Sequence, residues 1–302
     1  MSNKNDSLGD RMKGYESVSK TSLVKRMPVA VRIDGRAFHT FTRGFNKPYD
    51  AVLSNSMRRT MQCLCENVQG CVLGYTQSDE ITLVLVDYQT VNTNAFFDNE
   101  VQKICSITAS MATSAFSKFF VEEAQRFMYN TNMARAMLLH GDKLAGRTGY
   151  TMDEYKEEYG LDEEWLSDVK NIEKLFDAYT RRFESMIMFD SRCFNIPKEE
   201  VANLILWRQQ DATRNSIEML GRHYFSQKQL HKKNCSQIQD MLMEEHGVNW
   251  NDVKTVFKRG SCCIKKDVEL SETLTRRKWA IDTEIPVFTG DGRDYIEKLI
   301  FV

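Results

Sequence analysis

The segment GCVLGYTQSDEITLVLV, residues 70–86, contains two apolar runs rich in β-branched residues, separated by the polar stretch 76–80. Two such runs on either side of a short polar segment are typical of a β-hairpin. The sequence therefore predicts two antiparallel strands, over residues 70–75 and 81–86, with Asp79 near the tip of their turn.

A further strand is predicted upstream, over residues 28–33 (PVAVRI), where an apolar run is bounded by a proline and by Gly35. Asp34 follows this strand directly. If the strand and the hairpin lie side by side in one sheet, Asp34 and Asp79 converge although they are far apart in the chain.

Two helices are predicted around the hairpin. In residues 50–68 the apolar side chains recur at steps of three and four, which places them on one helical stripe. Residues 99–120 show a similar pattern, with small residues that permit close approach to a sheet. A last apolar run, residues 186–189, predicts a fourth strand just before Asp190. The order β-α-β-β-α-β indicates an α+β fold of the ferredoxin-like type.

The two aspartates predict a metal site. An ionised carboxylate buried without a partner costs several kcal/mol, so two of them held together need cations. Oxygen ligands favour Mg2+, which takes one or two carboxylates besides substrate phosphates. Two Mg2+ ions about 3.5–4 Å apart would hold the attacking and leaving oxygens of an in-line displacement. Considered alone, Asp34 could form part of a turn with Gly35, and Asp79 could lie in a hairpin turn without any chemical role. Because the predicted topology brings the two together, we favour the metal site.

Composition narrows the class of protein. The 302 residues suffice for a sizeable core and are expected to form one compact unit. A net charge of −1 argues against a uniformly basic surface that would bind nucleic acid but leaves room for a local basic cleft.

The sequence has no 18-residue apolar run and no signal-peptide core, so no association with a membrane is expected. Eight cysteines without CxxC or CxxH spacing, and five histidines, argue against zinc and favour the cytoplasm or another reducing compartment.

The remaining chain divides into an insertion and an extension. Residues 121–182 are charged and helix-prone, and we interpret them as a helical insertion whose charges form a solvated face without chemistry. The core is then residues 1–120 and 183–225, and residues 226–302 form a basic C-terminal extension. After Pro197 a helix is predicted that presents hydrogen-bond donors beside an aromatic ring, which suits either RNA contact or a network of ion pairs. The candidate RNA-binding residues are Trp207, Arg208, Gln209, Arg214, Asn215, Lys258 and Arg259.

Five motifs in this chain together carry a family resemblance. They are residues 32–39 (RIDGRAFH), Lys47-Pro48 with Asp50, residues 77–80 (QSDE), residues 207–211 (WRQQD) and residues 258–260 (KRG). With these motifs in this order, the chain resembles histidine tRNA guanylyltransferase and the guanylyltransferase-like proteins over nearly its whole length outside residues 121–185.

The resemblance implies a polymerase palm and an enzyme that adds nucleotides to the 5′ end of tRNA, in the reverse direction to ordinary polymerases. It implies that Asp34 and Asp79 bind two Mg2+ ions, with the Gly35 carbonyl as a further ligand, and that Glu80 supports catalysis electrostatically. It also implies a homotetramer. The incoming nucleoside triphosphate, GTP, ATP or another, would be bound by Asp34, Gly35, Arg36, Ala37, Phe38, His39, Lys47, Ser78 and Asp79.

Two departures bear on specificity. The eukaryotic histidine tRNA enzymes carry His-Ile-Asn-Asn where this chain has residues 213–216 (TRNS), and Thr76 stands where a glycine is common. Both favour the guanylyltransferase-like branch, which implies templated repair of tRNAs that lack 5′ nucleotides. The alternatives are a histidine tRNA guanylyltransferase that adds one extra guanosine, a palm-type nucleotide cyclase, and a tRNA-binding protein without catalysis.

Overall fold

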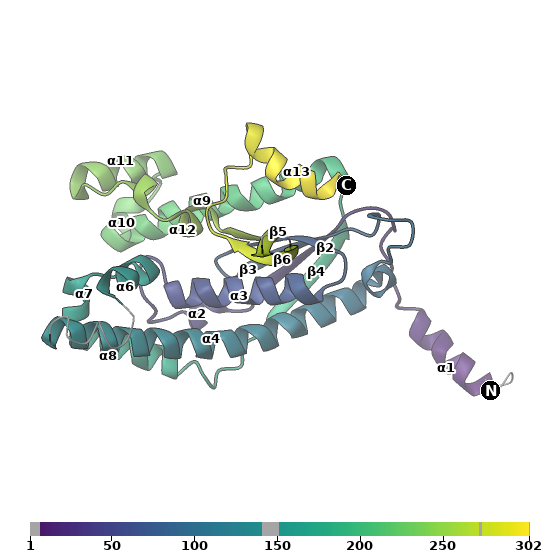
Figure 1. Ribbon diagram of the computed structural model, residues 1–302, viewed down its shortest axis with the longest axis horizontal. Helices are drawn as coiled ribbons and strands as arrows, with labels where there is room; N and C mark the ends of the chain where they lie inside the picture. The colour runs from purple at the N-terminus through teal and green to yellow at the C-terminus, as the bar shows by residue number, and fades with distance from the viewer. Residues whose placement is uncertain (1–6, 141–150, 272–273, 302) are drawn as a thin grey trace.

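A computed structural model describes residues 7–140, 151–271 and 274–301 (Figure 1). Its centre is a six-stranded sheet in which all neighbouring strands are antiparallel, in the order β4-β1-β3-β2-β5-β6. The strands are β1 (Val29–Gly35), β2 (Cys71–Gln77), β3 (Glu80–Leu85), β4 (Phe189–Asn195), β5 (Ser261–Ser271) and β6 (Leu274–Asp282).

The predicted order of strands and helices is present. α3 (Ala51–Asn67) connects β1 to the β2–β3 hairpin, and α4 (Val101–His140) connects the hairpin to β4. Both helices cover the same face of the sheet (Figure 1). Asp50 caps α3, because its carboxylate accepts the backbone N–H of Leu53 at 2.8 Å.

The opposite face of the sheet is covered by α9 (Val201–Tyr224) and α13 (Asp294–Ile300) (Figure 1). Strand alternation divides the apolar residues between the two faces. Ile81 packs on the side of α3 and α4, whereas Val84 packs with Val201 of α9 and Ile296 of α13. The sheet is therefore buried on both sides over its central strands.

Three features differ from the sequence-based predictions. The fourth strand was predicted over residues 186–189 and is found at Phe189–Asn195, because this edge strand alternates between covered and exposed side chains and has no continuous apolar run. The second core helix continues to His140 instead of ending near residue 120. Two strands, β5 and β6, were not predicted, since beyond Ile264 charged residues occupy both faces of their hairpin, as the neighbouring exposed residues Lys265 and Lys266 show.

In its described part, the insertion contains the distal end of α4 and, beside it, α6 (Met152–Tyr159), α7 (Glu163–Ser167) and α8 (Val169–Thr180). They bury Tyr155 and Tyr179, and Phe127 of α4 lies 5.8 Å from Tyr179 between ring centroids. The insertion is therefore packed into the main core. Val101–Leu139 of α4 is long and apolar enough to cross a membrane, and its packing against α3, β1 and β4 accounts for that composition.

The remaining elements include one helix outside the body and a small cluster with a core of its own. α1 (Ser7–Ser17) projects from the body and has no buried residue (Figure 1). A small cluster beyond the middle of α9 has its own apolar core, which includes Leu242 and Trp250. The other helices are α2 (Phe38–Phe41), α10 (Gln227–Leu230), α11 (Cys235–His246) and α12 (Thr255–Arg259), with short 3-10 helices η1 (Phe96–Asn99), η2 (Lys198–Glu200), η3 (Trp250–Asp252) and η4 (Gly290–Arg293).

Candidate active site

Strand pairing brings the two predicted aspartates to one end of the sheet. Asp34 in β1 lies opposite Glu80 in β3, and the backbone N–H of Gly35 donates to the carbonyl of Asp79 at 3.0 Å. The charge of Asp34 is close enough to raise the pKa of Asp79. The side chains predicted to converge are therefore near neighbours in space.

The turn of the hairpin orients Asp79. Ser78 adopts a left-handed backbone conformation, with φ of 50°. Its hydroxyl donates to Oδ1 of Asp79 at 3.0 Å. The backbone N–H of Asp79 also bonds to this carboxylate, and both bonds lower the pKa of Asp79. The carboxylate is thus held by the turn itself.

Burial and like charges make both carboxylates electrostatically unfavourable when ionised. Removal from water raises the pKa of Asp34, and the nearby carboxylate of Asp190 raises it further. Removal from water is also the main cause that raises the pKa of Asp79. Neither carboxylate forms an ion pair with any described residue. A cation is the missing partner that this arrangement favours.

β4 contributes an acidic residue that the sequence analysis did not assign to the site. Asp190 lies directly opposite Asp34 in the sheet, and Arg192 lies opposite Arg32. Arg192 donates to Asp190 at 2.9 Å. The sequence analysis placed Asp190 directly after a predicted strand, as it did Asp34, and this signal could have assigned Asp190 to the site.

Glu80 is held in a buried ion pair. Arg208 of α9 donates from Nε to Oε1 at 2.7 Å and from its terminal nitrogen to Oε2 at 2.9 Å. Both side chains are 9% exposed, and Arg208 also donates to Asp211 at 2.9 Å. Since both oxygens of Glu80 are occupied, Glu80 connects the sheet to α9 and is not an open carboxylate beside Asp34.

The residues predicted to bind the nucleotide after β1, residues 35–39, differ in backbone conformation and in burial. Gly35 is required, because a Cβ atom there would lie 2.4 Å from the ring of Phe38. Ala37 begins α2 in a left-handed conformation, with φ of 57°. Phe38 is buried in the aromatic core against Phe116, whereas Arg36, Ala37 and His39 are exposed. Phe38 therefore shapes this loop from below and presents no ring to a ligand.

Lys47 lies in a separate cavity. Its neighbours there come from the loop before α3, from the insertion and from the end of α9, and Asp34, Ser78 and Asp79 are not among the lining residues. The structure thus places Lys47 apart from the other predicted nucleotide-binding residues.

Three of the predicted tRNA-binding residues are buried. Arg208 is engaged by Glu80, Gln209 donates to the carbonyl of Pro286 at 2.8 Å, and Lys258 donates to the carbonyl of Asn251 at 2.5 Å. Their donors are used inside the protein, so we revise their assignment from RNA contact to structural support. Trp207 and Arg214 are exposed, and Asn215 and Arg259 are partly exposed.

The motif at residues 258–260 has a structural role as well. Gly260 has φ of +80°, and a Cβ atom there would lie 2.4 Å from the carbonyl oxygen of Thr76. The hydroxyl of Tyr75 donates to the carbonyl of Arg259 at 2.6 Å. Glycine at this position lets β5 approach β2 closely, so the motif fixes the start of the strand that extends the sheet.

The donor set at Asp34 and Asp79 fits Mg2+. Two carboxylates and a backbone carbonyl at Gly35 are hard oxygen ligands, and Mg2+ commonly completes its shell with water and substrate phosphates. Within the described residues no group of three or more His, Cys, Asp or Glu side chains could hold a metal. This matches a site that relies on the substrate for part of its ligands.

Comparisons with known proteins give one family. Residues 9–141 match the family described as tRNAHis guanylyltransferase, Thg1. A solved bacterial tRNA(His) guanylyltransferase (Thg1)-like protein in complex with ATP is 34% identical, with a TM-score of 0.70, and the match covers 97% of this chain and 99% of that chain.

Two further matches agree. A bacterial Thg1-like protein in complex with GTP is 31% identical, with a TM-score of 0.66, over 98% of this chain and 100% of that chain. The probable tRNA(His) guanylyltransferase of Drosophila melanogaster is 22% identical over 83% of this chain and 71% of its own length.

The buried ion pair gives a stability prediction. Arg208→Ala leaves the buried Glu80 with the longer contacts to Arg32 at 3.8 Å and to the hydroxyl of Thr82 at 3.4 Å, and we expect it to lower the free energy of unfolding by about 3–5 kcal/mol. Arg222→Ala, on the same helix, removes an ion pair to Glu218 whose arginine side chain is 68% exposed, and it should change stability by less than about 0.5 kcal/mol. Urea denaturation of both variants tests this. Equal stabilities would contradict the structural role of Arg208.

The close aspartates give a pH prediction in metal-free buffer. Asp34→Asn removes a negative charge, so the pKa of Asp79 should fall toward its ordinary value of 3.8, as measured by carboxyl NMR. A raised carboxyl pKa makes the folded state less stable as pH rises through that pKa. The variant should therefore gain stability over the wild type at pH 7, and this gain should vanish below about pH 3. An unchanged pKa of Asp79 would show that the two charges do not interact.

Proposed function

The chain belongs to the Thg1 family of tRNAHis guanylyltransferases, which add nucleotides to the 5′ end of tRNA, and on this premise we propose that it repairs tRNAs that lack 5′ nucleotides. Repair here means that each added nucleotide is selected by pairing with the opposite strand of the acceptor stem. The substrates would be GTP, ATP and the other nucleoside triphosphates, with Mg2+ as the cofactor.

The identity of residue 213 is our reason for proposing repair instead of the addition of a single guanosine. The eukaryotic histidine tRNA enzymes that this chain resembles have a histidine in that place, whereas here the hydroxyl of Thr213 donates to the carbonyl of Lys258 at 3.2 Å. The side chain therefore ties α9 to α12. Identities of 34% with the bacterial Thg1-like protein and 22% with the Drosophila enzyme support the same branch.

The reaction joins the 3′-hydroxyl oxygen of the incoming nucleotide to the phosphorus at the 5′ end of the RNA, and a leaving group departs from that phosphorus. Asp34, Asp79 and the Gly35 carbonyl would hold Mg2+. When bound, Mg2+ neutralises charge that develops on the phosphate oxygens and polarises the bonds to phosphorus. The protein's own residues set the geometry for this chemistry.

Each neighbouring residue has a proposed part in that geometry. Ser78 fixes the carboxylate of Asp79 through its hydrogen bond. Glu80, locked by Arg208, fixes the end of β3 against α9. Arg36 and His39 are exposed at the end of β1, where they are available to the phosphates of a bound nucleotide. These positions support nucleotide binding between β1 and the hairpin turn.

We expect both aspartates to be indispensable. Asp34→Ala and Asp79→Ala should each lower the rate of nucleotide addition on the order of a hundredfold or more, because each carboxylate is needed to hold the metal ions. The fold should be retained, since each change removes one of two repelling charges. Rates measured at saturating Mg2+ test this. A variant that is folded and as active as the wild type would refute the metal-site assignment.

The repair proposal is tested by substrate choice. Several tRNAs shortened at the 5′ end are each incubated with one labelled nucleotide at a time. We expect addition of the Watson–Crick complement of the opposing base, in more than one tRNA, ending when the acceptor stem is complete. Changing the opposing base should change the nucleotide added. Guanosine addition to full-length histidine tRNA alone, whatever the opposing base, would contradict repair.

A further inference from the structure

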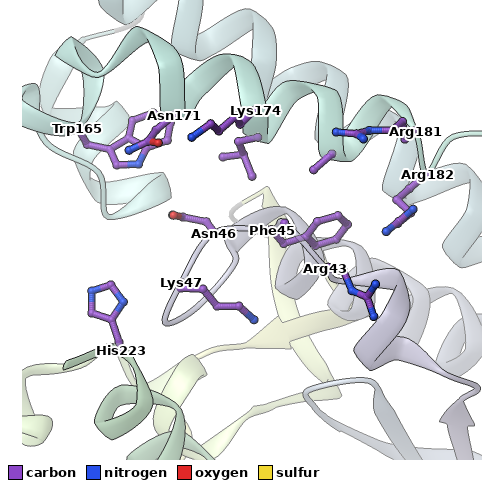
Figure 2. A pocket seen from close by; sticks show the side chains of 13 residues that line it. Arg43, Phe45, Asn46, Lys47, Trp165, Asn171, Lys174, Arg181, Arg182 and His223 are labelled. Atoms are coloured by element: carbon purple, nitrogen blue, oxygen red, sulfur yellow. The ribbon is translucent and has the colours of Figure 1, made fainter. Parts of the chain in front are cut away.

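A cavity of about 670 Å³ separates the insertion from the loop that precedes α3 (Figure 2). α8 and the two arginines that follow it form one wall, the loop with Arg43 and Lys47 faces this wall, and His223 from α9 closes a third side. Of the described residues, five lysine or arginine side chains and no acidic side chain line it: Arg43, Lys47, Lys174, Arg181 and Arg182.

One of these five cations, Lys47, acts electrostatically on the buried carboxylate of Asp50, whose pKa it lowers. Within the described residues, none of them forms an ion pair with a carboxylate. A neighbouring cavity of about 550 Å³ shows the usual alternative. There, four cationic side chains are accompanied by four glutamates: Arg58, Arg59, Arg126 and Lys254 with Glu123, Glu157, Glu158 and Glu284. The contrast indicates that the cavity beside α8 is built to meet negative charge from outside the chain.

The walls of this cavity are tied together. The hydroxyl of Tyr179 in α8 donates to the buried carboxylate of Asp50 at 2.6 Å, and the same carboxylate oxygen accepts the backbone N–H of Asn46 at 2.9 Å. Arg182 donates to the carbonyls of Phe41 and Thr40 at 2.7 and 3.1 Å. The insertion and the loop therefore hold their cations at a fixed separation, which lowers the entropic cost of binding a ligand.

The ligand chemistry follows from what the cavity lacks. A nucleoside triphosphate is bound together with Mg2+, which requires carboxylate or similar oxygen ligands, and no carboxylate lines this cavity. The phosphodiester groups of RNA are neutralised by lysine and arginine alone. The amides of Asn46 and Asn171 add uncharged donors of the kind that also contact phosphate oxygens.

We propose that this cavity binds phosphate groups of the tRNA backbone, so that the insertion forms part of the RNA-binding surface. The proposal rests on the proposed function, since it takes tRNA as the substrate. It assigns Lys174 and Arg181 of the insertion, together with Lys47 of the loop, to positioning of the RNA. It also replaces the interpretation of the insertion as a solvated face without chemistry.

The test uses the double variant Lys174→Ala/Arg181→Ala in the full-length chain. Both side chains are exposed, so the fold should be retained, as checked by thermal unfolding. We expect tRNA affinity to fall on the order of tenfold at moderate salt, and the slope of log affinity against log salt concentration to decrease by about 1–2. The Michaelis constant for the nucleotide and the rate at saturating tRNA should not change.

A matched control removes the same number of positive charges elsewhere. Lys118→Ala/Lys298→Ala changes two exposed lysines on α4 and α13 and should leave both tRNA affinity and the salt slope unchanged. The single variant Lys174→Arg keeps the positive charge at that position and leaves Arg181 unchanged. Its affinity for tRNA should equal that of the wild type. Binding is measured without nucleotide, so its outcome does not depend on whether addition is templated.

Two results would overturn the proposal. Unchanged tRNA affinity and salt slope in the Lys174→Ala/Arg181→Ala variant would show that the cavity does not bind RNA. A raised Michaelis constant for the nucleotide, with unchanged tRNA affinity, would assign the cavity to the triphosphate instead. Failure of templated addition by the wild type would refute repair and leave the binding result standing.

Discussion

Backbone hydrogen bonds between β1 and β3 set the positions of Asp34, Asp79 and Glu80 in the candidate site. The register places Asp34 opposite Glu80, and the bond from Gly35 to Asp79 closes the pairing at the turn. A shift by one residue would turn Asp34 toward the apolar core beside α3 and bring Ile33 to the site. Burial of Ile33 and Ile81 against that core therefore protects the register on which the chemistry depends.

Charge is distributed unevenly around this end of the sheet. Glu80 and Asp190 each have an arginine partner, whereas Asp34 and Asp79 have none among the described residues. The two paired acids are thus neutralised by the protein, and the two unpaired acids remain available to a cation. Arg208 is bonded to Glu80, and its positive charge also acts on Asp34, whose pKa it lowers, so it favours the ionised carboxylate that a metal ion would bind.

Much of this arrangement could be predicted from the sequence. Period-two and period-three-to-four patterns located β1, the β2–β3 hairpin, α3 and the first half of α4, and residues that follow strands gave Asp34 and Asp79. Other features depend on contacts that no local pattern records. β4 is an edge strand with half its side chains exposed, and β5 and β6 carry charges on both faces beyond Ile264.

Whether the polar motifs would be buried or exposed was less predictable from the sequence than the fold. Arg208, Gln209 and Lys258 have the composition of RNA-binding residues, but they are buried and bonded inside the protein. Conversely, the basic cavity draws Lys47, Lys174 and His223 from three distant segments, and only the folded chain brings them together. A donor-rich sequence shows which groups are available, whereas tertiary packing decides which of them reach solvent.

The bond between Tyr179 and Asp50 makes the start of α3 depend on the insertion. Asp50 is 8% exposed, and without the hydroxyl of Tyr179 one of its oxygens would lose one of its two partners in a largely buried place. The other oxygen of the same carboxylate caps α3. Removal of the insertion would therefore disturb the start of α3 as well, so the insertion is an integral part of the core and not a detachable module.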